Sequence, residues 1–410
     1  MPPNRPALTR SMTLLFATAC GIVIANIYYS QPLLAVIAQT FGRSAASLGF
    51  LVTMTQLGYA CGLLTIVPLG DALNRRTLII TLLLCGVLAL FAVAASPTFL
   101  LFAIASVLLG VSTCSAQLLV PFAASLADEK ERGRVVGMVM SGLLLGILLA
   151  RTVSGLIAQF AGWRALYVIA ALVGLLLTGL LARALPKDER DIPLAYGSLM
   201  KSLLTLIREN PSLRLRSLCG ALAFACFSVL WTGLTFLLSQ PPYNFSESKI
   251  GAFGLAGAAG TLAASYAGRM ADRGHGNLAT GLFSASILVS FAFIFAGAHS
   301  LVALVVGILL LDIGVQGLHI SNQGVIYALA HDARSRVTTV YLTSYFIGGA
   351  LGSSMASISY ARYGWSGVCL AGAATASLLI AVWLISRFRQ TSGEVSPLVC
   401  NEQVRERQLQ

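Results

Sequence analysis

Long apolar stretches recur along the whole chain, and only short polar segments lie between them. A helix that crosses a bilayer needs about 20 apolar residues. The pattern therefore predicts an all-α membrane protein with twelve transmembrane helices. Their expected bounds are 11–39, 46–70, 77–95, 97–127, 134–160, 164–185, 213–240, 248–270, 277–297, 300–330, 335–361 and 365–387.

The polar segments between these stretches divide the chain and predict its orientation. The loops and tails on one side would hold 22 of the 27 Lys and Arg residues, and the opposite loops four, which indicates that both termini are cytoplasmic. The expected divisions are an N-tail at 1–10, a six-helix bundle at 11–185, a cytoplasmic linker at 186–212, a second six-helix bundle at 213–387 and a C-tail at 388–410.

Composition excludes several classes of function. Hydrophobic residues make up 57% of the chain and charged residues only 10%, against about 25% charged in soluble domains. The net charge of +12 is typical of a membrane protein with basic cytoplasmic loops, so it does not indicate nucleic-acid binding. The eight Cys residues include no CxxC pair, and no nucleotide-binding loop occurs, so we expect no metal, no cofactor, no ATP drive and no enzymatic activity.

The two halves of the chain repeat one another. RGRVVGMVMSGLLLG at 132–146 aligns with RSRVTTVYLTSYFIGG at 334–349 at an offset of 202, and the same offset pairs Gly162-Trp163 with Gly364-Trp365. Because each half has six expected helices, the repeats share one orientation. The sequence thus predicts two parallel six-helix repeats, an arrangement known in the major facilitator superfamily.

The loop after the second expected helix, PLGDALNRR at 68–76, resembles the loop signature of that superfamily through Asp71, Arg75 and Arg76. A second copy at 268–276 carries Asp272 and Arg273. The resemblance implies that these residues form a latch on the cytoplasmic side. The alternative is a solvated turn.

Two further stretches, NIYYSQPLL and DIGVQGLHISNQ, are similar to a bacterial sugar and drug efflux branch, the arabinose-efflux-like transporters. One departure limits what can be carried over. Many proton-coupled exporters of the superfamily have an Arg in the fourth helix four residues before a Gly, whereas here Gly110 is preceded at that spacing by Ser106.

Charged residues within the apolar segments mark the predicted site. In LDIGVQGLHISNQGVIY at 311–327, Asp312, Gln316, His319 and Gln323 share one helical face, which cannot face lipid. Arg151 is the one basic residue that we place deep in an expected helix, at the same depth as Asp312, roughly 15–18 Å below the outer surface. A charge at mid-membrane costs at least about 2.5–3.5 kcal/mol, so both are candidates for function.

We hypothesise that Asp312, Arg151 and His319 couple transport to protons. Protonation of Asp312 would break a pair with Arg151 and change which side of the cavity is open. The alternatives are a static ion pair or two residues that never meet. His319 is either a proton relay or a neutral hydrogen-bonded contact.

The resemblance implies that the first, fourth, seventh and tenth helices line a substrate cavity, and these hold most of the deep polar residues. The candidates are Asn26, Tyr29, Gln31, Gln117, Trp231, Thr235, Gln316, Asn322 and Gln323. The alternative for each is an interhelical hydrogen bond, worth about 0.6 kcal/mol. A second group of small residues is expected to pack the two bundles together, or else helices within one bundle: Gly58, Gly62, Gly142, Gly146, Gly257, Gly348 and Gly352.

Together these features predict a monomeric secondary transporter in a bacterial inner membrane. Its partners would be a small-molecule substrate, protons and the lipid bilayer. The expected activity is proton-coupled export by alternating access. The alternatives are proton-coupled uptake of a small anionic metabolite, with Arg151 holding its carboxylate, or a non-transporting membrane sensor or scaffold.

Overall fold

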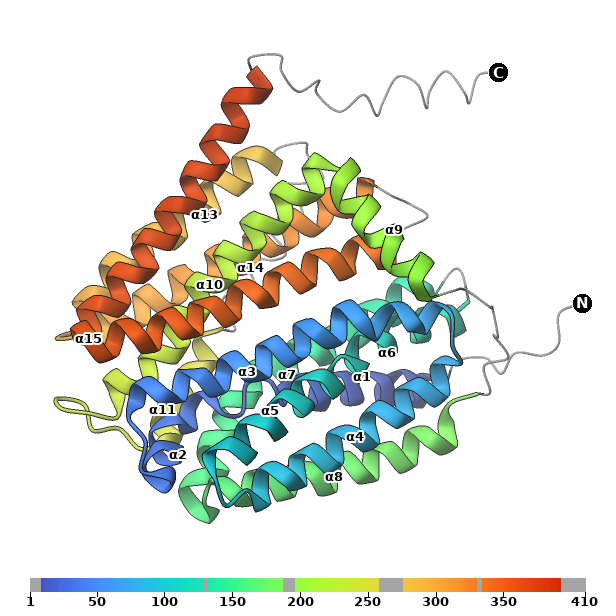
Figure 1. The fold of residues 1–410 in the computed structure, drawn as a ribbon, viewed down its shortest axis with the longest axis horizontal. Helices are drawn as coiled ribbons and strands as arrows, with labels where there is room; N and C mark the ends of the chain where they lie inside the picture. The colour runs from blue at the N-terminus through green and yellow to red at the C-terminus, as the bar shows by residue number, and fades with distance from the viewer. Residues whose placement is uncertain (1–8, 129–130, 187–195, 258–275, 330–333, 392–410) are drawn as a thin grey trace, which may run out of the picture.

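The computed structural model describes residues 9–128, 131–186, 196–257, 276–329 and 334–391, and the regular structure in these ranges is helical. Nine of the helices in the described ranges are long and apolar enough to cross a membrane. In Figure 1 the helices of the first half, in blue and teal, lie on one side, and α10, α13, α14 and α15 lie on the other.

The first half contains α1 (Arg10–Ala25), η1 (Gln31–Leu33), α2 (Leu34–Phe41), α3 (Ala45–Thr65), η2 (Val67–Asp71), α4 (Arg75–Ala95), α5 (Phe99–Thr113), α6 (Ser115–Leu126), α7 (Arg132–Ala161) and α8 (Trp163–Ala184). The second half contains α9 (Tyr196–Glu209), α10 (Pro211–Leu238), α11 (Glu247–Ala252), η3 (Phe253–Gly257), α13 (Gly276–Ala296), α14 (Leu301–Leu329) and α15 (Arg334–Thr391). Apart from α9, these helices coincide with the expected apolar segments wherever the chain is described. The arrangement as twelve spans in two sixes stays a prediction, because residues 258–275 lie outside the described ranges.

Two equivalent glycines mark corresponding turns in the two halves. Gly162, between α7 and α8, has φ 83°, and Gly364 has φ 60° and ψ −150°. Both lie in the half of conformational space that favours glycine. Figure 1 shows α15 as two arms that meet at a sharp bend, so it supplies both the eleventh and the twelfth expected helices.

Three of the expected helices are interrupted near the middle of the molecule. The first breaks into α1, η1 and α2, where Pro32 removes a backbone donor. The fourth breaks at Cys114 between α5 and α6, and the eighth changes from α11 to η3. Irregular backbone at membrane depth is tolerated where protein surrounds it. The breaks at Pro32 and Cys114 are buried, whereas the break at η3 includes Leu255, which is 48% exposed.

The expected polar linker contains a helix that its composition did not predict. In α9, Leu199 and Leu203 are buried, and the helix contacts α10 and α15. The hydroxyl of Tyr196 donates to the carbonyl oxygen of Thr65 at the end of α3, at 3.2 Å. The linker helix therefore touches both halves.

Six of the seven predicted interface glycines pack within a single half, which corrects the expectation. A Cβ atom at Gly142 or Gly146 would meet the backbone of α1, and one at Gly348 or Gly352 would meet the backbone of α10. Gly58 and Gly62 lie against the backbone of α5 in the same way. The GxxxG spacing identified close helix contacts correctly, but a sequence pattern does not name the partner helix.

The actual contact between the halves uses other residues. Gly155 of α7 lies against the backbone of α11, and Thr152 donates to the carbonyl oxygen of Gly251 at 3.0 Å. Thr53 of α3 donates to the carbonyl oxygen of Ala350 on α15 at 3.1 Å. Of the predicted glycines, Gly257 does lie between the halves, because a Cβ atom there would meet Asp312 on one side and Leu148 on the other.

Candidate functional site

Arg151 lies at the centre of the contact between the halves and is only 3% exposed. Its Nε donates to Oε1 of Gln31 at 2.7 Å. Three aromatic rings surround the guanidinium, whose Cζ lies 4.0 Å from the ring centroid of Trp231, 4.8 Å from that of Tyr28 and 5.3 Å from that of Phe227. Cation–π contacts of this kind stabilise a cation that burial has stripped of water.

Asp312 faces the same centre from α14 and is 2% exposed. Its charge interacts with that of Arg151, but no ion pair within 4.0 Å joins these two described residues. The indole N–H of Trp231 lies near the Asp312 carboxyl group without forming a hydrogen bond that would satisfy it. The structure thus brings Arg151 and Asp312 together without direct contact.

The break in the eighth expected helix lies beside both charged side chains. A Cβ atom at Gly254 of η3 would lie 2.9 Å from Cβ of Arg151, and one at Gly257 would lie 3.1 Å from Oδ2 of Asp312. Glycines let this backbone approach both side chains closely. We therefore call Arg151, Asp312, Gln31 and Trp231, together with Tyr28 and Phe227, the central site.

Four buried polar atoms of the central site have no hydrogen-bond partner in the structure. They are Nη2 of Arg151, Nε2 of Gln31, Nε1 of Trp231 and Oδ1 of Asp312. The backbone of Gln31 is held in place, because the hydroxyl of Thr235 donates to the backbone carbonyl oxygen of Gln31 at 2.8 Å. Buried polar groups in native proteins are nearly always satisfied, so a cluster of unsatisfied atoms indicates a place for water or a ligand.

A second buried polar centre lies within the C-terminal half. Arg216 of α10, which is 8% exposed, donates through Nη1 to Oγ1 of Thr280 at 2.7 Å and to Oδ1 of Asn322 at 3.3 Å. The amide of Asn322 donates back to the carbonyl oxygen of Arg216 at 3.4 Å. We did not predict this centre. Arg216 is close enough to the expected helix end that its sequence position suggested a solvated loop cation.

His319 belongs to the C-terminal half and does not contact the central site directly. Its Nδ1 lies 2.9 Å from the hydroxyl of Tyr341, and its ring lies 4.8 Å from that of Tyr345. His319 therefore contacts two tyrosines of α15.

The other predicted cavity residues are distributed over several places. Gln117 donates to the hydroxyl of Tyr59 at 3.1 Å, and Gln316 and Gln323 are half-buried on α14. Asn26 lines a cavity of about 20 Å³ inside the N-terminal half, away from Arg151. Tyr29 is buried in the core.

Of the two adjacent tyrosines, Tyr28 and not Tyr29 contacts Arg151. The broken helix around them sets which ring points to the centre, and the turn between α1 and η1 does not follow a regular helical period. Helical periodicity alone could not have distinguished them.

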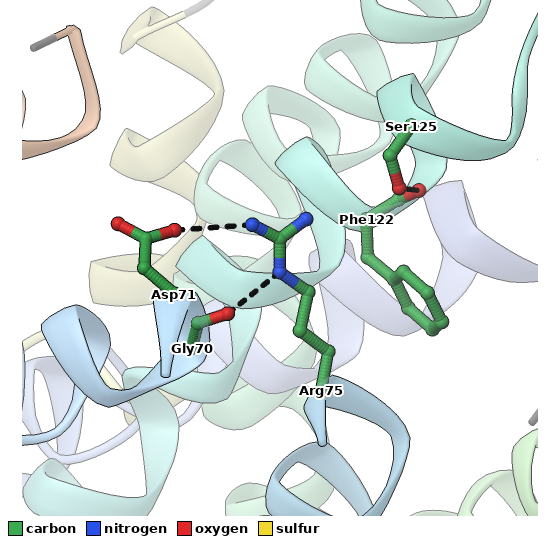
Figure 2. A network of polar contacts seen from close by, with 5 residues as sticks. All are labelled: Gly70, Asp71, Arg75, Phe122 and Ser125. Carbon is green, nitrogen blue, oxygen red and sulfur yellow. Dashed lines mark hydrogen bonds and ion pairs between the residues drawn. The ribbon is translucent and has the colours of Figure 1, made fainter. Parts of the chain in front are cut away.

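The predicted latch is a local structure in the N-terminal half. Figure 2 shows Arg75 extending back along the loop, where its Nη2 donates to Oδ1 of Asp71 at 3.0 Å and its Nε donates to the carbonyl oxygen of Gly70 at 2.7 Å. Arg76 donates to the carbonyl oxygen of Ala182 at the end of α8, at 2.6 Å. The η2 segment that carries Asp71 also contacts α15 of the other half. The second copy, with Asp272 and Arg273, lies outside the described residues.

Comparison with known proteins finds one family over most of the chain. A profile of the Major Facilitator Superfamily matches residues 14–353. An uncharacterized Escherichia coli transporter, YgaY, is 46% identical over 95% of this chain and 99% of its own length. A Pasteurella multocida protein named "Probable sugar efflux transporter" is 22% identical over 93% of each chain.

Among solved structures, the fold is similar to that of a bacterial homolog of the human lysosomal transporter Spinster, solved in an inward-facing and occupied conformation. The TM-score is 0.75 at 14% identity, over 94% of this chain and 98% of the other.

Proposed function

The chain belongs to the major facilitator superfamily, and on that premise we propose that it is a proton-coupled secondary active transporter of a small organic molecule. The observation that carries the proposal is Asp312. This carboxyl group is buried between the two halves near a cation, and one of its oxygens has no hydrogen-bond partner. An ionisable group at membrane depth is expensive to maintain, and such groups characteristically mark ion and proton pathways.

Protonation of Asp312 changes the net charge of the central site. With Asp312 ionised, its charge offsets that of Arg151, which interacts with it without touching it. With Asp312 protonated, the guanidinium loses its counter-charge. Because both groups sit where the halves meet, their charge state biases how the halves pack, and this links the proton to alternating access.

The contact between the halves combines small and large groups. The backbone approaches at glycine and the single hydroxyl hydrogen bonds of Thr152 and Thr53 would separate easily when the halves move. The rings of Tyr59 and Phe346, 4.4 Å apart between centroids, and the rings of Phe227 and Trp231 over Arg151 would have to part in the same movement. The loop that carries Asp71 and Arg75 would then act as a latch where η2 contacts α15.

The central site is compatible with either of two directions of transport, export or uptake. In export, which the chain's similarity to one relative named as a probable sugar efflux transporter favours, a proton and the substrate would compete for Asp312 and move in opposite directions. In uptake they would bind together. The specific observation in favour of uptake is that Arg151 and its neighbours Gln31 and Trp231 present three unpartnered hydrogen-bond donors, which suit an anionic substrate.

We further propose that the protein lies in the bacterial inner membrane as a monomer, with both termini in the cytoplasm. The distribution of Lys and Arg supports this orientation. Enzymatic activity has no support in the family match, and a non-transporting sensor would be the conclusion only if the purified protein moved no solute.

Purified protein in liposomes that contain a pH-sensitive dye provides the test. Cationic, neutral and anionic solutes are added outside to wild type and to Asp312→Asn. We expect one class of solute to drive proton movement in wild type and none to do so in Asp312→Asn. Equal proton coupling in the two proteins would show that Asp312 is structural, while the family assignment would stand. The sign of the proton movement distinguishes export from uptake.

A further inference from the structure

The unpartnered atoms of the central site are unevenly divided between donors and acceptors. Nη2 of Arg151, Nε2 of Gln31 and Nε1 of Trp231 are donors, and Oδ1 of Asp312 is the single acceptor. All four residues are at most 3% exposed, so bulk water does not satisfy them in this state. Each such atom costs about 1–3 kcal/mol if it stays unpaired.

These atoms belong to one cluster. Arg151 touches two of the other three residues directly, through its hydrogen bond to Gln31 and its stacking at 4.0 Å on Trp231. It interacts with Asp312 electrostatically, and Asp312 lies near the Trp231 indole N–H. The guanidinium is fixed by Nε and by three rings, and this leaves Nη2 presented to a bound molecule.

Different ligand classes would satisfy this cluster to different extents. An organic cation would leave all three donors unpaired and would stand beside the charge of Arg151. A neutral amide offers one acceptor oxygen and no charge. A carboxylate offers two oxygens with about four acceptor sites and pairs with Arg in an especially favourable geometry.

The charges give a second argument. A carboxylate beside an ionised Asp312 would place two negative groups in a buried site, which disfavours the charged form of both. If Asp312 carries a proton, the site holds Arg151 as a cation, the bound carboxylate as an anion and a neutral Asp312. The net charge is then zero, and the protonated carboxyl group becomes a fourth donor.

We propose that the transported substrate carries a carboxylate, which Arg151, Gln31 and Trp231 bind together, and that it binds when Asp312 is protonated. This rests on the proton coupling at Asp312 proposed above and, within it, selects the uptake direction. One proton enters and leaves the site with each carboxylate, so the two move across the membrane in the same direction.

The test uses purified protein and a panel of straight-chain and aromatic monocarboxylates, each with its matched amide and matched amine. Binding is measured by thermal stabilisation at pH 5.5 and pH 7.5. Transport is measured in the dye-loaded liposomes, with valinomycin and potassium holding the membrane potential at zero. We expect at least one carboxylate to stabilise the wild type, its amide and amine to have little effect, and protons to enter the liposomes with it.

The pH dependence and the variants sharpen the result. Binding of the carboxylate should weaken by up to about tenfold per pH unit once Asp312 ionises, because one proton is bound with each ligand. Asp312→Asn should bind the same carboxylate equally at both pH values and carry it without protons. Arg151→Gln should weaken binding at least about 100-fold. Gln31→Leu should weaken it by a smaller factor.

Arg216→Gln is the matched control, because it removes a buried arginine whose hydrogen bonds lie within the C-terminal half. It should leave the affinity for the carboxylate unchanged. The proposal is overturned if an amine or amide binds in preference to its carboxylate, or if none of the carboxylates binds. In the first case, proton movement that Asp312→Asn abolishes would leave the proposed coupling intact. If no solute moves protons even in wild type, the proposed function itself fails.

Discussion

The two buried arginines occupy contrasting environments. Arg216 lies inside the C-terminal half, where side chains from α13 and α14 accept its hydrogen bonds. Arg151 lies between the halves, where Gln31 accepts one hydrogen bond, aromatic rings cover the guanidinium and Nη2 has no partner. Both are less than a tenth exposed, so burial alone does not separate them.

The difference lies in how completely each charge is satisfied. Around Arg216, Thr280 and Asn322 come from helices of the same half, so their contacts persist when the halves move relative to one another. Around Arg151, the partners come from both halves and leave donors unpaired. A buried cation whose hydrogen bonds are all made stabilises one packing arrangement. A buried cation that lacks some of its hydrogen bonds, at an interface that moves, can gain them from a ligand, and this favours ligand binding.

The largest expected effect comes from replacing each of the two arginines with glutamine in a separate variant. Arg151→Gln should reduce substrate binding about 100-fold or more, because it removes a charge-assisted donor from the central site. Arg216→Gln should instead lower the free energy of unfolding by about 1–3 kcal/mol, because it leaves the bonds to Thr280 and Asn322 unmade. Ligand affinity and thermal unfolding, measured on both variants, distinguish the two outcomes. If Arg216→Gln lowers ligand affinity as strongly as Arg151→Gln does, the two arginines do not differ in function as described.

An intermediate effect is expected from two glycines on α7. Gly155 meets α11 of the other half, and Gly146 meets α1 of its own half. Gly155→Leu should separate the halves at that contact, slow transport and raise the reactivity of a cysteine introduced at Thr152, with the native cysteines replaced. Gly146→Leu should lower the unfolding temperature. Similar loss of thermal stability in both variants would indicate that the α7–α11 contact is static packing.

The smallest expected effect separates the two adjacent tyrosines. Tyr28 lies over the Arg151 guanidinium, and a desolvated cation–π contact is worth about 1–2 kcal/mol. Tyr28→Leu should therefore weaken substrate binding about 5- to 30-fold. Tyr29→Leu should leave binding unchanged and act only on stability, since Tyr29 is buried and is not one of the rings over Arg151. Isothermal titration of both variants checks this. Equal losses of affinity would place both rings in the central site.

Much of this arrangement was predictable from the sequence. The apolar segments coincide with helices wherever the chain is described. The hypothesised pair of Arg151 and Asp312 is not formed as a direct ion pair, although their charges interact. The burial of Arg216 was not predictable, because its position near a helix end suggested solvent. The partners of Gly146 and Gly348 were not predictable either, because a small-residue pattern records that a close contact exists and does not identify the neighbour.

The sequence by itself determined which segments are long and apolar enough to cross a membrane, and that the two halves of the chain repeat one another. It also placed two residues of opposite charge, Arg151 and Asp312, deep within apolar segments. These properties follow from residue hydrophobicity and from the helical rise, which act along the chain. The tertiary structure decided which rings cover Arg151, which polar atoms have no hydrogen-bond partner and at which glycines the two halves meet. These depend on how helices rotate about their axes and where they break, and such choices are fixed only when distant segments pack together.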